Sequence, residues 1–193
     1  MHEIAPGIRH WTAPHPNLGV EVSSYWLPGL RVLLDPLAVP DEVDGVEQIV
    51  LSNRHHKRDA FEAAERFGAP VRVPRVGLHE FAEDDPVEPY DFEAPFAGGA
   101  ITAYQVTRYW PDDGALHIPS ASALAIADTV VNYDGIRFVP DNLMGDDPEE
   151  EKNDIKQTLA RVAEELEFEH LLLAHGAPIP GEGRERLREF ASA

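Results

Sequence analysis

The side chains best suited to chemistry gather in one short stretch, Leu51-Ser-Asn-Arg-His-His-Lys-Arg-Asp-Ala60. Imidazole nitrogens such as those of His55 and His56 ligate transition metals. The cationic groups of Arg54, Lys57 and Arg58 bind carboxylates and phosphates. The stretch therefore predicts a metal site, an anion site or both, and the alternative is an ordinary basic surface loop.

The composition of the chain limits which partners and which metal ligands are possible. The chain has 35 acidic and 16 basic residues, a formal net charge of −19 at pH 7. That charge argues against nucleic acid or an anionic membrane as a partner, because the mean field would repel phosphates. The absence of cysteine excludes disulfides, thiolate metal sites and a catalytic thiol. A transition-metal site would therefore use histidine and carboxylate ligands.

The elements on either side of the stretch would hold it at the edge of a sheet. The apolar run 46–51 is typical of a buried strand. Asp59 and Glu62 are spaced like a capping box at the start of a helix that ends before Gly68. With a strand over residues 71–74, this order predicts a βαβ unit whose first turn lies at the carboxyl edge of a sheet.

The rest of the chain alternates between strand and helix patterns. We expect strands over residues 4–11, 20–27, 30–35, 100–108, 115–118, 123–131, 138–140 and 170–175, and helices beginning at Pro148 and spanning residues 185–191. The acidic, proline-rich residues 79–97 are predicted to be a loop. The length suits one domain over residues 1–193. Without a secretion signal pattern or an apolar run of about 18 residues, we expect a cytoplasmic protein.

The order of these parts resembles the metallo-β-lactamase fold superfamily, whose members are mostly binuclear metal hydrolases. The motifs that carry the resemblance are Ile4-Ala-Pro-Gly-Ile, Leu33-Leu-Asp-Pro, Ile49-Val-Leu-Ser-Asn-Arg-His-His, Ala127-Asp-Thr and Leu172-Leu-Ala-His-Gly. The resemblance covers almost the whole chain. It implies an α/β fold with four layers, an αββα sandwich.

The family's metal-binding motif, HxHxDH after a Leu-Thr pair, is only partly present. Placing Leu51-Ser52 on that pair puts Asn53 at the first His, His55 at the second, Lys57 at the Asp and Arg58 at the last His. The family's next ligand falls on Tyr109, whereas the bridging Asp and the final His are matched by Asp128 and His175. The resemblance thus implies His55, Asp128 and His175 as the remaining ligands. An alternative placement, shifted by one residue, makes His56 the ligand and puts Asp59 at the last position.

Two functions are compatible with this pattern. In the first, cationic side chains such as Lys57 and Arg58 take the place of the metal ions, no cofactor is resident, and the pocket binds a small anionic ligand. The residues expected to bind that ligand are Arg54, His56, Lys57, Arg58 and Tyr109, with Trp110 beside them in the wall.

In the second function, His55, Asp128 and His175, with or without His56, hold one zinc or other divalent ion that hydrolyses an ester, thioester or lactone. In both functions Asp35 and Asn53 are expected to contact the site residues and orient them rather than bind the ligand. The expected partner is a small molecule in either case.

Overall fold

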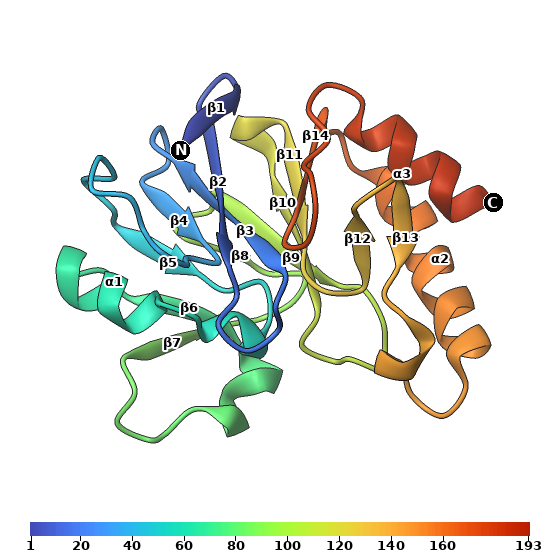
Figure 1. Ribbon diagram of the computed structural model, residues 1–193, viewed down its shortest axis with the longest axis horizontal. Helices are drawn as coiled ribbons and strands as arrows, with labels where there is room; N and C mark the ends of the chain where they lie inside the picture. Colours follow the sequence, from blue (N-terminus) through green and yellow to red (C-terminus); the bar gives the residue numbers. More distant parts are fainter.

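Two β-sheets pack face to face, and helices cover their outer faces (Figure 1). The computed structural model describes residues 1–193. Helix α1 (Ala60–Phe67) lies on the outer face of the first sheet, and α2 (Pro148–Glu165) and α3 (Gly183–Ser192) lie on that of the second. The predicted αββα sandwich is therefore confirmed.

The first sheet contains seven strands in chain order. They are β1 (His2–Ala5), β2 (Ile8–Pro14), β3 (Glu21–Leu27), β4 (Val32–Leu34), β5 (Gln48–Val50), β6 (Val71–Pro74) and β7 (Val87–Tyr90). Neighbours are antiparallel from β1 to β4 and parallel from β4 to β7. Because Leu34 pairs with Val50, the residues that follow β4 and β5 reach the same edge of the sheet.

The second sheet has five strands. Their spatial order is β14 (His170–Leu173), β11 (Ala123–Ile126), β10 (Gly114–Ile118), β9 (Ile101–Gln105) and β8 (Pro95–Phe96). Strands β11 and β14 run parallel, with Ile126 opposite Leu173. Asp128 and His175 each follow that pair by two residues, so the register places them level with each other. A separate hairpin, β12 (Val130–Asn132) and β13 (Ile136–Phe138), extends from the end of β11.

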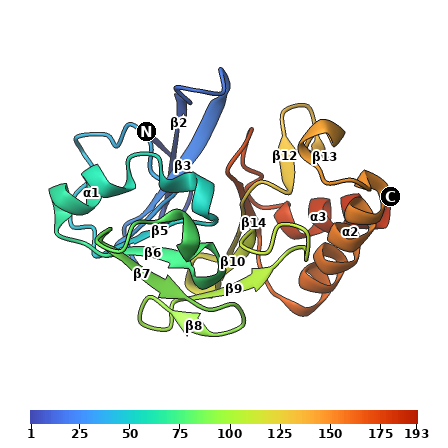
Figure 2. The ribbon, with the colours of Figure 1, turned by 90° about the horizontal axis from the view of Figure 1, so that it is seen from below.

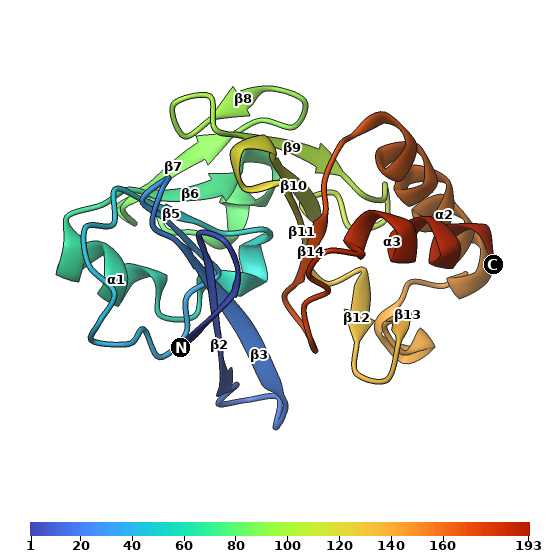
Figure 3. The ribbon, with the colours of Figure 1, turned by 90° about the horizontal axis from the view of Figure 1, so that it is seen from above.

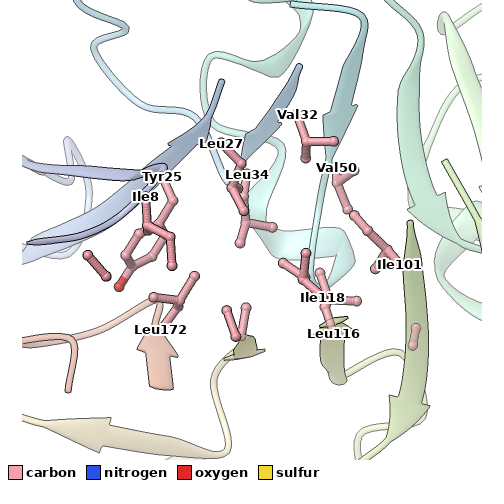
Figure 4. Close-up of a cluster of buried hydrophobic side chains, with 14 of the residues drawn as sticks. Ile8, Tyr25, Leu27, Val32, Leu34, Val50, Ile101, Leu116, Ile118 and Leu172 are labelled. Carbon is pink, nitrogen blue, oxygen red and sulfur yellow. The ribbon is translucent and has the colours of Figure 1, made fainter. Parts of the chain in front are cut away.

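The main core lies between the two sheets. Figure 4 shows Ile8, Tyr25 and Leu34 of the first sheet pointing toward Leu116 and Leu172 of the second. The hydroxyl of Tyr25 donates to the Leu173 carbonyl at 2.7 Å and accepts from the Leu173 amide at 3.0 Å. These bonds satisfy the buried phenol and fix β3 against β14.

The structure differs from the sequence-based expectations in several segments. The predicted loop 79–97 contains two strands, β7 and β8. The range 4–11 is divided by a turn at Pro6–Gly7, and 123–131 is interrupted between β11 and β12. Four short 3₁₀ helices connect other elements: η1 (Arg54–Lys57), η2 (Arg75–Glu80), η3 (Pro119–Ala121) and η4 (Asp141–Leu143). No helix combines the length and hydropathy that crossing a bilayer requires.

Candidate functional site

Four strand ends from the two sheets meet at one edge of the sandwich. Asp35 follows β4, and the 3₁₀ helix with His56 follows β5. Asp128 follows β11, and His175 follows β14. Carboxyl ends of parallel strands are where α/β proteins commonly place functional side chains. Here two such ends from each sheet face one another.

The imidazole of His56 is the centre of the site. Its Nε2 lies 3.0 Å from Asp128 Oδ1. On the other side of the ring, Nδ1 lies 2.9 Å from Ser52 Oγ and 3.1 Å from Asp35 Oδ2. Asp35 in turn accepts both the amide of Ser52 at 2.8 Å and its hydroxyl at 2.6 Å. The ring is therefore held between two carboxylates that come from different sheets.

Three side chains contact the carboxylate of Asp128. His175 Nε2 lies 2.9 Å from the same Oδ1 that contacts His56. The second oxygen, Oδ2, accepts from the Asn53 amide at 2.7 Å. Asn53 also accepts the His56 backbone amide through Oδ1 at 3.1 Å, so this one side chain caps η1 and positions Asp128.

The charges in the cluster shift one another's pKa values. Burial by itself lowers the pKa of His56, but the carboxylates of Asp128 and Asp35 outweigh it and raise that pKa to about 9. Burial raises the pKa of Asp128, but His56 and His175 hold it well below its ordinary value. His56 is thus a cation at neutral pH in the protein without a bound ion.

Two buried carboxylates that the sequence analysis did not select complete the site. Asp113 precedes β10 and accepts the backbone amides of Asp128 at 2.8 Å and Thr129 at 3.2 Å. Burial and the charge of Asp128 raise the pKa of Asp113 to about 7. Asp112 accepts the backbone amide of Arg54 at 3.0 Å and pairs with its guanidinium. The sequence signal that could have identified both residues is the Pro-Asp-Asp-Gly turn before β10, because β10 is antiparallel to β11 and Asp128 follows the end of β11.

The side chain of Arg58 also lies beside this cluster. Its Nη1 donates to the carbonyl oxygens of Ser23 and Asp35, both at 2.8 Å. Its Nε and Nη2 are buried without a hydrogen-bond partner. Burial lowers the pKa of Arg58, and the carboxylates of Asp35 and Asp128 oppose that shift. An arginine remains charged in such surroundings, so a second cation lies near the two acids.

The structure places two residues of the basic stretch elsewhere than the first placement of the motif implies, and His56 lies where the alternative placement puts a ligand. We expected His55 to approach Asp128, but His56 does so, because neighbours in a 3₁₀ helix point about 120° apart and η1 turns only His56 inward. We also expected Lys57 at the site. Its Nζ lies instead 3.6 Å from Asp85 Oδ2 and 4.1 Å from the centre of the Phe61 ring, on the side of α1.

A pocket of about 930 Å³ opens beside the cluster. Asn53, Asp113, Asp128 and His175 form its polar wall, and Arg54, His55, Tyr109 and Trp110 also line it, whereas His56, Lys57 and Arg58 do not. The β2–β3 hairpin and the β12–β13 hairpin project from the same side of the molecule in the views from below and from above (Figures 2 and 3). Residues from both hairpins line the pocket.

The donor set fits one metal ion. One ligand atom from each of His56, Asp128 and His175 lies within 4.8 Å of the others. Two imidazoles and a carboxylate suit zinc or iron, and Asp35 orients His56 as carboxylates orient metal-bound histidines. A second ion does not fit, because Asp128 Oδ2 already accepts from Asn53 and the remaining motif positions carry Lys57 and Arg58.

Comparisons with known proteins identify the architecture. No family model matches the chain, and no curated protein matches it in sequence. Among solved structures, the DIM-1 metallo-β-lactamase superposes with a TM-score of 0.70 at 14% identity, over 98% of this chain and 95% of that protein. A metallo-β-lactamase from Pontibacter korlensis gives 0.68 at 15% identity, over 99% and 97%.

A third structure, a rubredoxin oxygen:oxidoreductase from Desulfovibrio gigas, gives a TM-score of 0.66 at 13% identity. It covers 99% of this chain, which spans 61% of the length of the oxidoreductase. The similarity in all three structures extends over both sheets and the helices outside them. The chain therefore has the metallo-β-lactamase fold.

Proposed function

We propose that this protein is a metallo-β-lactamase-fold binding protein whose site works without a metal ion. The imidazolium of His56 and the guanidinium of Arg58 supply the positive charge that Asp35 and Asp128 require. The observation that carries the proposal is that both ring nitrogens of His56 face acceptors, Asp35 and Ser52 on one side and Asp128 on the other. Two protons on the ring satisfy all of these acceptors, and two cations balance two carboxylates.

The ligand of this site is a small anion. Arg54 and Lys152 in the pocket wall are paired with carboxylates, Asp112 and Asp141. Arg137 and His55 also line the pocket, and neither has an acidic side chain within ion-pair distance. In a protein with a net charge of −19, unpaired donors gathered in one pocket favour an anionic molecule there.

A second candidate function is supported by the convergence of His56, Asp128 and His175. These three residues would hold a single divalent metal, which would polarise the substrate carbonyl and activate a water for hydrolysis of an ester, thioester or lactone. Asp35 and Ser52 would then keep a proton on His56 Nδ1 and leave Nε2 free to ligate. Asn53 would hold the carboxylate of Asp128 in place.

Metal analysis separates the two functions. Protein purified without chelator is expected to contain substoichiometric zinc, iron and manganese, and EDTA is expected to leave its thermal unfolding unchanged. A bound ion at a hundred times its dissociation constant would stabilise the fold by about 2.7 kcal/mol. Near-stoichiometric metal that His175→Ala removes would overturn the metal-free proposal and favour the hydrolase.

An NMR titration of the full chain tests the ligand. Acetate and inorganic phosphate are expected to shift resonances of residues that line the pocket. Arg137→Gln should weaken this binding several-fold, since it removes an unpaired cation from the wall. Arg161→Gln, on the outer surface of α2, is the matched control and should leave binding unchanged. Failure of both anions to perturb the pocket would contradict the proposed function.

A further inference from the structure

Four of the side chains that line the pocket are apolar and exposed, and we call them the apolar collar: Leu18, Val20, Tyr133 and Leu143. Their exposed fractions are 61%, 38%, 44% and 59%. The protein exposes five large hydrophobic residues in all, and only Val76 lies outside this pocket. Single exposed apolar residues are ordinary on protein surfaces, but four that line one pocket indicate a binding surface.

Three separate segments contribute to the collar. Leu18 and Val20 belong to the turn between β2 and β3, Tyr133 to the turn between β12 and β13, and Leu143 to η4. Both hairpin turns lie on the same side of the molecule (Figures 2 and 3). The four collar residues thus lie far apart in the sequence, and the tertiary fold brings them together. Val131 and Val139, both buried, continue the apolar surface into the pocket wall.

A cation lies within this apolar surface. The guanidinium of Arg137, on β13, is 5.4 Å from the centre of the Tyr133 ring. Arg137 lines the same pocket and has no acidic partner. A planar guanidinium with free N–H groups matches a carboxylate, which it binds through two parallel hydrogen bonds. The pocket thus offers an apolar surface and an anion-binding group side by side, in a volume typical of small-molecule sites.

We propose that the ligand is a small amphiphilic carboxylic acid, whose acid group pairs with Arg137 and whose apolar body covers the collar. This inference rests on the proposed function, because it names the class of anion that the pocket binds. The apolar body removes the collar from water, which adds affinity that a short acid lacks.

A homologous series of acids on the full chain tests the inference. The probes are acetate, butanoate, hexanoate and octanoate, titrated by NMR. Affinity is expected to rise about fourfold for each added methylene until the collar is covered. Leu18→Asn and Leu143→Asn should flatten this dependence. Val76→Asn changes another exposed apolar residue, outside the pocket, and should leave the dependence unchanged. Because all three side chains are exposed, thermal unfolding should be nearly the same in every variant.

The outcomes are distinguishable. Equal affinity for acetate and octanoate would overturn the amphiphile and leave the anion-binding function standing. A chain-length dependence that Leu143→Asn does not change would also overturn the inference, because the collar would not be the surface used. If neither an acid of any length nor inorganic phosphate binds, the proposed function itself fails, whereas binding of phosphate alone would overturn only the amphiphile. Self-association that the collar variants abolish, without any chain-length effect, would assign the collar to a second copy of this chain.

Discussion

At the scale of single residues, Arg58 combines a strained backbone with a buried charge. It has a φ of 38°, in the region that favours glycine, and two of its guanidinium nitrogens are buried without partners. Such a backbone conformation costs about 1–3 kcal/mol in a residue with a side chain. The rest of the fold offsets this strain, which argues that the position of the guanidinium has a role.

Replacing Arg58 by Met tests that role. Methionine keeps the backbone strain and most of the volume, but it removes the hydrogen bonds to Ser23 and Asp35 and leaves the nearby carboxylates with less positive charge. We expect a loss of about 2–4 kcal/mol in the free energy of unfolding, measured with urea. Lys57→Met makes the same charge change one residue earlier, at an exposed position, and should cost less than about 1 kcal/mol. Equal losses in the two variants would show that Arg58 is not an internal counter-charge.

The sequence identified most members of the site but not their partners. Asp128 and His175 each come directly after an apolar run that is typical of a buried strand. Their proximity at one edge of a sheet could therefore be predicted. The choice between His55 and His56 depends on how η1 turns, and the sequence does not determine that turn. Asp113 was missed because its function is to bind backbone amides of residues 128 and 129, a contact between segments that a local pattern does not reveal.

At the scale of elements, the site depends on a close approach between the first and second sheets. Gly114, the first residue of β10, donates its amide to the carbonyl of Ser52 at 3.1 Å and accepts from Ala127 at 3.2 Å. The turn after β5 and the turn after β11 are thus both attached to one residue. A Cβ atom on Gly114 would lie 2.9 Å from the Ser52 oxygen, closer than such contacts normally are.

Gly114→Ala should therefore push β10 away from the turn that carries His56. The added Cβ would clash with the backbone oxygen of Ser52, which cannot move away as a flexible side chain could. We therefore expect a loss of about 2 kcal/mol or more in the free energy of unfolding. Faster hydrogen exchange over residues 52–56 and 126–129 should accompany it. Gly29→Ala is the control, since a Cβ there meets nothing within 4 Å, and its effect should stay within about 0.5 kcal/mol. A stable Gly114→Ala variant with unchanged exchange would mean that the sheets do not need this contact.

Helices and strands with a regular spacing of apolar residues could be predicted from the sequence. Strands that depend on pairing with distant segments could not. The helix over residues 60–67 was expected, but Asp59 does not cap it, since its carboxylate accepts the amide of Ala38 at 2.7 Å. Strand β7 was missed because it is short and carries Glu88 and Pro89, which disfavour strands in isolation. Pairing with β6 and burial of Tyr90 outweigh that local preference.

At the scale of the whole molecule, a chain of two hydrogen bonds, from His10 through Ser23 to Gly176, connects β2 and β3 to the segment after β14. The hydroxyl of Ser23 donates to the Gly176 carbonyl at 3.1 Å, so its oxygen accepts from His10 Nε2 at 3.0 Å. His10 Nδ1 is then a buried nitrogen with no partner. Burial, followed by the nearby charges of His2 and the N-terminal amine, lowers the pKa of His10 to about 4. Protonation would place an N–H where no acceptor is available.

This arrangement predicts a loss of stability in mild acid. In the unfolded chain His10 regains its ordinary pKa of about 6.5, so between that pH and about pH 4 the unfolded state binds a proton that the folded state does not. Stability should fall across this window as the pH is lowered, and His10 should contribute nothing above it. Comparing urea unfolding at pH 7 and pH 5, we expect the wild-type protein to lose roughly 1–2 kcal/mol more than His10→Gln, allowing for solvent screening. His79→Gln, at an exposed position, should behave like the wild type. If His10→Gln and the wild type lose stability in parallel, the acid sensitivity arises elsewhere and protonation of His10 does not destabilise the fold.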